Sequence, residues 1–202
     1  MNMYEFCAAL VRIYYKIFFR SRIFGAENVP KDGGMLICVN HLSNNDAVLV
    51  GSNIPRRLRF MAKKELFSVP LLNILVKGLG AFPIDRSVSD IGAVRTALSI
   101  LKSGGALMIF PEGRRNKEFL PEKVLPGAAT IAYKANVPIL PAYIDGKYRL
   151  FGRTDVYFGK PVSPEEIGEM LKNAALDPKT KNLTVSNFLY GIIKGSQERL
   201  ES

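Results

Sequence analysis

Short apolar runs alternate with segments of helical periodicity along most of the chain, and this alternation is the feature that most limits the possible folds. Six runs have the length and composition of buried strands: 35–39, 59–62, 81–84, 106–110, 139–144 and 155–159. Helical patterns fall between or after them, at 46–51, 70–77, 90–101, 127–136, from 164 onward and at 184–200. This order predicts an α/β fold in which helices flank a mixed, largely parallel sheet.

Two local details of this pattern concern a proline and a helix start. Pro141 lies inside the run 139–144, and we expect it to interrupt that strand because proline offers no N–H to a ladder. Ser87 or Ser89 is expected to cap the helix at 90–101. In such sheets functional loops leave the carboxyl ends of strands, so the residues after each apolar run are where a site is expected.

The first 24 residues are rich in aromatic and aliphatic side chains but also carry regularly spaced cations. Arg12, Lys16 and Arg20 are four residues apart, which places them in one stripe of a helix. Cations near the middle make a membrane-spanning helix costly, and the order of charges differs from that of a secretory signal. A basic stripe among aromatic residues is typical of a helix that lies along a membrane interface. The side chains expected to contact the membrane are Arg12, Lys16, Phe18, Phe19 and Arg20.

The chain is expected to divide into a membrane-interface helix at 1–24 and one domain at 25–202, since no linker or repeat splits the latter. A buried core helix whose basic stripe faces water is the alternative for 1–24. The formal net charge of +10 favours an anionic partner such as anionic lipid, a phosphorylated substrate, an acidic carrier protein or nucleic acid. Nucleic-acid binding would need a recognisable motif and a basic face with interleaved aromatics, and we find neither.

Cysteine and histidine content argues against a metal site. Cys7 and Cys38 form no C-x-x-C pair, and His41 is the only histidine, so a zinc-type cluster is not expected. Cys38 lies in the apolar run 35–39, which favours a core position over a nucleophilic one.

His41 follows directly after the apolar run 35–39, and Asp46 comes five residues later. Because partners on one helix face lie three or four apart, the chain must turn between them. The residues from Leu42 to Asn45 suit a turn that folds the carboxylate back onto the imidazole. Such a pair fixes the tautomer and raises the basicity of the other ring nitrogen. The alternative is a helix start, with Asn45 or Asp46 as the cap and His41 merely hydrogen-bonded.

A second polar cluster follows the apolar run 106–110. Glu112, Gly113, Arg114 and Arg115 crowd the end of this run. Guanidinium groups suit phosphate, and a carboxylate can hold an arginine or bind a hydroxyl. Arg86 likewise follows the run 81–84. The alternative for each is a solvated charged turn.

These residues, in this order, closely resemble the glycerolipid (lysophospholipid) acyltransferase family. Four motifs carry the resemblance: Asn40-His41 with Asp46, Gly80 to Arg86, Phe110-Pro111-Glu112-Gly113 with Arg115, and Val137-Pro138-Ile139-Leu140-Pro141. They span most of the domain. Arg114 stands where the family usually has Thr, and Asn116 where it usually has Ser.

The resemblance implies acyl transfer from a thioester, acyl-CoA or acyl carrier protein, to a lysophospholipid. The implied acceptor is 1-acyl-glycerol-3-phosphate, with glycerol-3-phosphate or another lysolipid as alternatives. It also implies that His41 is the general base, that Asp46 orients it, that Arg86 and Arg115 bind phosphate and that Glu112 and Gly113 shape that site. No cofactor or metal is implied. We expect a peripheral protein at the cytoplasmic face of the cell membrane, with a non-catalytic membrane-binding module as the rival.

Overall fold

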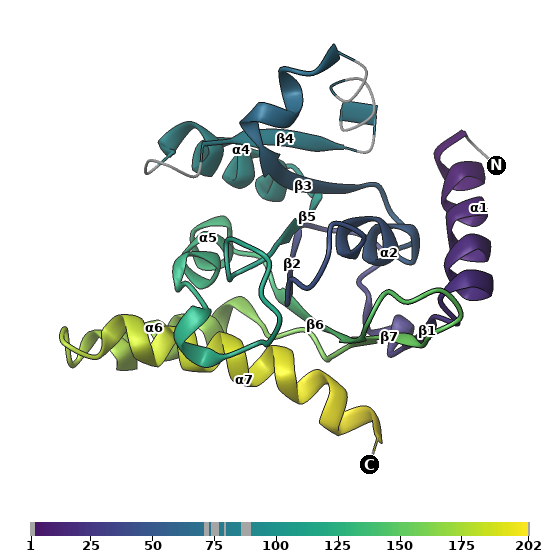
Figure 1. The fold of residues 1–202 in the computed structure, drawn as a ribbon. Coiled ribbons are helices and arrows are strands. Elements are labelled where there is room, and N and C mark those ends of the chain that lie inside the picture. The colour runs from purple at the N-terminus through teal and green to yellow at the C-terminus, as the bar shows by residue number, and fades with distance from the viewer. Residues whose placement is uncertain (1–2, 71–72, 74–76, 79, 86–89, 202) are drawn as a thin grey trace.

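The fold is a seven-stranded sheet between two layers of helices (Figure 1). The structure is a computed structural model that describes residues 3–70, 73, 77–78, 80–85 and 90–201, with side chains within 8–197. The strands are β1 (Arg22–Phe24), β2 (Met35–Val39), β3 (Leu58–Lys63), β4 (Ala81–Ile84), β5 (Ala106–Ile109), β6 (Ile139–Gly146) and β7 (Thr154–Phe158). The α-helices are α1 (Met3–Phe18), α2 (Asp46–Ser52), α4 (Ile91–Lys102), α5 (Gly127–Ala135), α6 (Pro164–Ala175) and α7 (Lys181–Glu201). The helix expected at 70–77 falls partly outside the described residues.

The sheet has the order β1-β7-β6-β2-β5-β3-β4. Neighbours from β6 to β4 are parallel, whereas β7 pairs antiparallel with β6 and parallel with β1. The prediction of a mixed, largely parallel sheet is therefore confirmed. Because β6, β2, β5, β3 and β4 share one direction, their carboxyl ends meet at the same edge of the sheet.

Alternation along β2 shows how the two layers are built. Leu36 and Cys38 point into the core that α4, α5, α6 and α7 cover, while Met35, Ile37 and Val39 point into the core that α1 and α2 cover. All five side chains are fully buried, as expected for a central parallel strand. Cys38 therefore lies in the core, as predicted.

Two local expectations need correction. Strand β6 runs through Pro141 without interruption. Pro141 lies just before Ala142, which forms the first β6–β7 pair with Phe158, so its missing N–H removes no bond inside that ladder. Helix α4 is capped by Asp90, whose side chain accepts a hydrogen bond from the Ala93 N–H. The expected caps Ser87 and Ser89 lie outside the described residues.

The N-terminal helix is shorter than the expected 1–24. Helix α1 ends at Phe18, Arg20 takes a left-handed backbone with φ of 42°, and β1 then joins the sheet. Arg22 on β1 donates to both carboxylate oxygens of Asp155 on β7, at 3.0 and 2.9 Å. Phe24 stacks on Tyr157. These contacts explain why the segment after α1 is extended and belongs to the sheet.

Candidate active site

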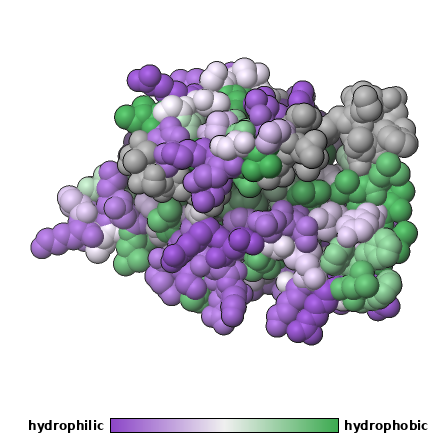
Figure 2. All heavy atoms as spheres, turned by 45° about the horizontal axis from the view of Figure 1, so that its top comes forward, coloured by the Kyte–Doolittle hydropathy of each residue, from purple (hydrophilic) through white to green (hydrophobic). Residues whose placement is uncertain are grey.

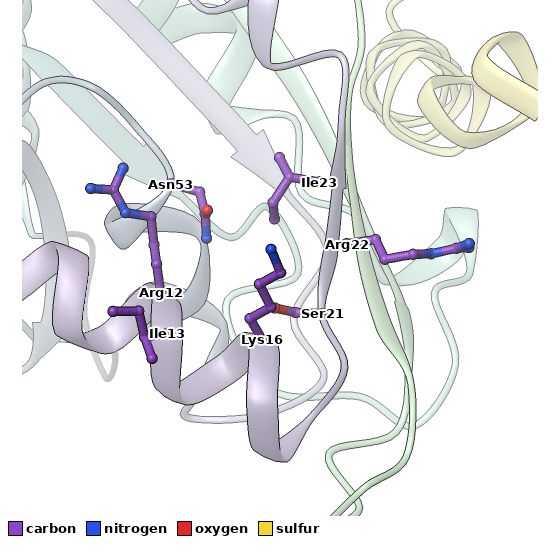
Figure 3. A pocket seen from close by; sticks show the side chains of 7 residues that line it. All are labelled: Arg12, Ile13, Lys16, Ser21, Arg22, Ile23 and Asn53. Atoms are coloured by element: carbon purple, nitrogen blue, oxygen red, sulfur yellow. The ribbon is translucent and has the colours of Figure 1, made fainter.

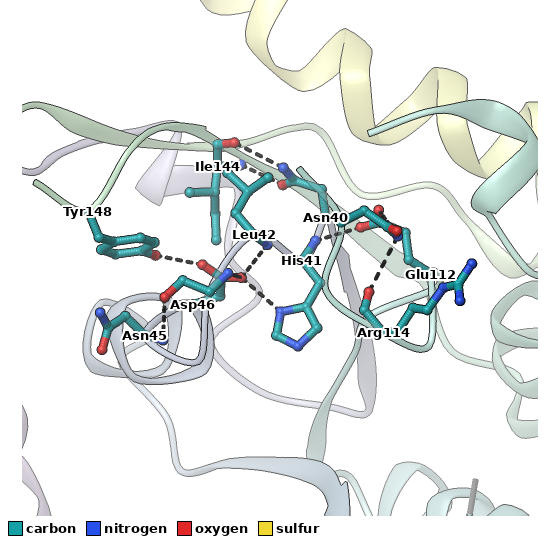
Figure 4. A network of polar contacts seen from close by, with 11 residues as sticks. Asn40, His41, Leu42, Asn45, Asp46, Glu112, Arg114, Ile144 and Tyr148 are labelled. Atoms are coloured by element: carbon teal, nitrogen blue, oxygen red, sulfur yellow. Dashed lines mark hydrogen bonds and ion pairs between the residues drawn. The ribbon is translucent and has the colours of Figure 1, made fainter. Parts of the chain in front are cut away.

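Three polar side chains gather where neighbouring parallel strands end. His41 follows β2, Glu112 follows β5 and Tyr148 follows β6. Strand β2 lies between β5 and β6 in the sheet, so the three segments meet although up to about a hundred residues separate them in the chain. Figure 4 shows them in one network around His41 and Asp46.

The turn after β2 brings His41 and Asp46 together. Nδ1 of His41 lies 2.8 Å from Oδ2 of Asp46. The same Oδ2 accepts the backbone N–H groups of Leu42 and Ser43, each at 2.7 Å. An oxygen that accepts these donors acts as an acceptor toward the imidazole too, so Nδ1 carries the proton and Nε2 carries the lone pair. Neither residue of the alternative caps α2 with its side chain: Asn45 makes no cap bond, and Oδ2 of Asp46 accepts N–H groups that precede the helix.

Tyr148 completes the surroundings of Asp46. Its hydroxyl donates to Oδ1 of Asp46 at 2.7 Å, so both carboxylate oxygens are occupied. Burial and, second, the neighbouring Asp46 charge raise the pKa of Tyr148 well above its ordinary value, so the phenol stays a donor. The ring packs edge-on against Tyr15 of α1 and against Phe19, which directly follows this helix. Helix α1 therefore contacts the residue that holds Asp46.

Glu112 braces the backbone of His41. Its Oε2 accepts the His41 N–H at 2.6 Å, and its Oε1 accepts the Asn116 side-chain amide at 2.8 Å. The Asn116 N–H in turn donates to the His41 carbonyl at 2.9 Å. Burial raises the pKa of Glu112, against the lowering effect of these hydrogen bonds. Glu112 thus holds the chain at His41, and among the described residues it pairs with no arginine, a point that the sequence had left open.

The His41 ring is held flat against Phe110, with the ring centroids 3.8 Å apart and the planes 14° apart. The edge away from Asp46 points out of the polar network (Figure 4). Phe110 and Glu112, which both contact His41, line a cavity of about 530 Å³. Its walls are mostly apolar, from Met61, Ile84, Met108, Ile109, Phe110 and Leu125. Asp85, Glu112 and Arg114 supply its charged groups.

The other residues predicted for substrate binding are only partly placed. Gly113 lines the cavity with φ of 66°, a conformation that favours glycine. Arg114 lies on the cavity wall, whereas Arg115 is exposed and is not among the lining residues. Arg86 lies outside the described residues. Within those residues, no group of three His, Cys, Asp or Glu side chains is placed to hold a metal ion.

The side chains predicted to contact a membrane lie on different faces of α1 and its end. Arg12, Lys16, Phe18 and Arg20 are exposed. Phe19 is buried against α2 and the sheet, so it is a core residue, and the prediction for it is wrong. An exposed apolar face is formed instead by Leu10, Ile13, Tyr14, Ile17 and Phe18, which are 36–55% exposed. Apolar side chains gather on the side of the molecule where α1 lies (Figure 2).

Sequence reasoning included Asn40 in the first motif without giving it a role, and it missed Tyr148. The Asn40 amide donates to the Ile144 carbonyl at 3.0 Å and accepts the Ile144 N–H at 2.7 Å, which ties the end of β2 to β6. Tyr148 follows the carboxyl end of β6. The strand-end rule that singled out His41 and Glu112 also applied to Tyr148, and was the signal that could have found it.

Comparison with known proteins fits this arrangement. A family model described as "Acyltransferase" matches residues 20–145, which cover more than half of the chain and include His41, Asp46 and Glu112. The chain belongs to the acyltransferase family. It is an acyltransferase, and the family resemblance seen in the four motifs is confirmed.

Known proteins with similar sequences, and one similar crystal structure, agree with this family assignment. The chain is 31% identical over 90% of its length to the 1-acyl-sn-glycerol-3-phosphate acyltransferase of Bacillus subtilis, of which 93% is covered. It is also 31% identical over 80% of its length to the Streptococcus pneumoniae protein of the same name, of which 62% is covered. The crystal structure of the 1-acyl-sn-glycerophosphate (LPA) acyltransferase PlsC from Thermotoga maritima superposes with a TM-score of 0.67 at 25% identity, covering 97% of this chain and 80% of that one. Among the described residues of this chain, no helix has the length and apolarity to cross a bilayer.

Proposed function

We propose that this acyltransferase moves a fatty acyl group from a thioester to the sn-2 hydroxyl of 1-acyl-glycerol-3-phosphate, giving phosphatidate. The relatives named for this reaction support the acceptor. The donor in the proposal is acyl-CoA or acyl carrier protein, with no further cofactor. The observation that carries the chemistry is the His41–Asp46 pair, at 2.8 Å, with the His41 ring stacked on Phe110, which lines an apolar cavity.

The proposed step is direct transfer. Nε2 of His41 takes the proton of the acceptor hydroxyl as its oxygen attacks the thioester carbonyl, while Asp46 holds the imidazolium that forms. The tetrahedral intermediate collapses to the ester, and the proton on His41 passes to the departing thiolate. An acyl-cysteine intermediate at Cys38 finds no support, since burial raises the pKa of its thiol to about 12 and the side chain is inaccessible.

The cavity beside Phe110 suits an amphiphile. Its apolar walls match an acyl chain, and Arg114 places a guanidinium group at the same cavity. We include Arg115 and Arg86 with Arg114 as groups that hold the acceptor phosphate, because guanidinium forks match phosphate oxygens. In this proposal Glu112 and Gly113 shape the loop that presents them.

The proposed place of action is the cytoplasmic face of the cell membrane, where the protein is peripheral. The exposed apolar face of α1 supports this, because side chains of this size gain free energy when they enter the acyl boundary of a bilayer. The net charge of +10 adds attraction to anionic lipids and to an acidic carrier protein.

The experiment is an acyl-transfer panel that offers lysophosphatidate, glycerol-3-phosphate and other lysolipids with either donor, read by thiol release and product mass. We expect phosphatidate from the wild type, and a rate about 10²–10⁴-fold lower for His41→Ala with an unchanged unfolding midpoint. Asp46→Asn keeps the side-chain shape and should also lose most activity. Near wild-type turnover by His41→Ala would remove the mechanism, and absence of thiol release with every acceptor would favour the non-catalytic module.

A further inference from the structure

Helix α1 has three faces, and one of them packs into a hydrophobic core of the chain. Val11, Tyr15 and Phe19, at its end, pack into the core that α1 shares with α2. The exposed apolar face defined above lies on the other side. Arg12 and Lys16 form a third, cationic face between these two, four residues apart on the helix.

This cationic face lies over a cavity of about 450 Å³. The cavity is lined by Arg12, Ile13, Lys16, Ser21, Arg22, Ile23 and Asn53. Figure 3 shows the Arg12 and Lys16 side chains reaching toward Asn53 and Ile23, whereas the Arg22 side chain points away from them. The segment after α1 and the end of α2 therefore border the half-open space that these two cations enter.

Among the described side chains, none balances the positive charge of this cavity. The lining residues include no carboxylate. Among the ion pairs between described side chains, none involves Arg12 or Lys16, while Arg22 is already held by Asp155. Two cations beside one half-open cavity repel each other, and an anion that enters the cavity relieves this repulsion, so the cavity favours an anionic ligand.

The apolar side chains that line the cavity indicate which kind of anion fits it. Ile13 and Ile23 line the cavity together with the aliphatic stems of Arg12 and Lys16. Ile13 also belongs to the exposed apolar face of α1 and connects the cavity to it. A ligand that fits both has an anionic head and an apolar tail that continues along the helix.

We propose that this cavity binds the phosphate group of an anionic phospholipid in the membrane surface, with the lipid chains beside the exposed face of α1. The proposal rests on the membrane-surface part of the proposed function. The site is separate from the catalytic one, since Asn53 and Asp46 lie at opposite ends of α2 and the two cavities share no lining residue. It gives the enzyme a fixed headgroup contact in addition to diffuse attraction.

The test measures association of the full chain with vesicles of phosphatidylcholine, with and without phosphatidylglycerol. Replacing both cations, Arg12→Ala with Lys16→Ala, is expected to weaken binding to anionic vesicles about 30-fold, because each basic residue near the surface contributes roughly a factor of five. The matched control removes the same charge from the exposed face of α4, with Arg95→Ala and Lys102→Ala, and should weaken binding less than about threefold.

A second variant tests whether anionic vesicles bind to this cavity or only to the positive charge of the surface. Ser21→Phe leaves the net charge unchanged but fills the cavity, and should weaken anionic binding by about tenfold, whereas Ser21→Ala should not. Wild-type binding by a Ser21→Phe protein with an unchanged unfolding midpoint would overturn the proposal, as would equal losses from the α1 and α4 charge variants.

Calorimetry with soluble probes distinguishes a lipid from free phosphate. Monomeric dihexanoyl phosphatidylglycerol is expected to bind the wild type and to lose affinity in the Ser21→Phe and double-alanine proteins, whereas inorganic phosphate should bind much more weakly. Equal affinity for both probes would make this a free-phosphate site and overturn the lipid assignment. Acyl transfer is measured separately, by thiol release. If the protein binds lipid through this cavity but transfers no acyl group, the proposed function is wrong and this inference still holds.

Discussion

Asp46 accepts four hydrogen bonds, and only one of them comes from His41. The two backbone donors come from the turn itself, so any sequence that forms this turn supplies them. The fourth donor, the Tyr148 hydroxyl, arrives from a different strand end. It fixes the carboxylate through Oδ1, the oxygen that His41 does not contact, and shares the negative charge of Asp46 with the imidazole.

Removing that hydroxyl should lower the rate. In Tyr148→Phe the Asp46 carboxylate loses one of its four hydrogen bonds and holds the His41 ring less firmly. We expect kcat to fall about tenfold with KM nearly unchanged, since a hydrogen bond to a charged group that orients the base is lost.

Tyr15→Phe is the matched control for this prediction. It removes a hydroxyl from the same aromatic cluster and leaves all four hydrogen bonds to Asp46 in place. A kcat near the wild-type value in Tyr148→Phe, or a rate loss shared equally by Tyr15→Phe, would reduce Tyr148 to a packing role.

The site residues that could be predicted from the sequence are those brought together by local geometry. His41 and Asp46 lie within one turn, so their spacing alone indicated contact, and the structure places them 2.8 Å apart. Tyr148 is 102 residues from Asp46, and no local pattern marks such a contact. A glutamate at position 112 could bind several kinds of partner, so its residue type did not predict which one. The pairing of β2 with β5 places it beside the His41 backbone.

At the scale of single elements, α1 shows how a helix can be predicted while its faces are not. Its apolar residues outnumber those that one packed face requires, and composition does not say which of them face the core. The structure assigns Tyr15 and Phe19 to the core and leaves Ile13 and Ile17 exposed. Strand β1 was missed because three residues are too few to show an alternating pattern, whereas β2 and β4 were predicted with their observed bounds.

The two faces of α1 should respond differently to the same truncation. Phe19→Ala should lower the free energy of unfolding by about 3 kcal/mol, because it empties a buried aromatic position. Ile17→Ala, at a side chain that is 55% exposed, should change it by less than about 0.5 kcal/mol. Vesicle association should show the reverse order, with a roughly tenfold loss for Ile17→Ala as apolar burial in the bilayer is removed.

Denaturant unfolding and vesicle flotation on both variants check this prediction. The comparison needs no further control, because each variant serves as the control for the other in one of the two measurements. Equal destabilisation by the two substitutions would place Ile17 in a packed interface, and the interfacial orientation of α1 would then be wrong.

At the scale of the whole molecule, the N-terminal segment is tied to both the sheet and the site. Strand β1 adds to the sheet beside β7, and α1 packs on α2, which begins with Asp46. A division into an interface helix at 1–24 and a separate domain at 25–202 would cut through these contacts. The contacts favour one cooperative unit in which α1 is also part of the catalytic domain's core.

This has a direct consequence for a chain shortened to residues 25–202. Without α1 and β1, the face of the sheet formed by Met35, Ile37 and Val39 loses part of its cover, and Asp155 loses Arg22. Tyr148 also loses both aromatic neighbours from the α1 region. We therefore expect the shortened chain to lose cooperative thermal unfolding and acyl transfer together, even with a soluble short-chain acceptor that requires no membrane.

The full chain with Ile13→Ser and Ile17→Ser is the control, because it removes the apolar membrane contact and keeps every core contact. It should unfold cooperatively and acylate the soluble acceptor at the wild-type rate while losing vesicle binding. A 25–202 chain that melts cooperatively and remains active on the soluble acceptor would show that the first 24 residues are an appended anchor after all.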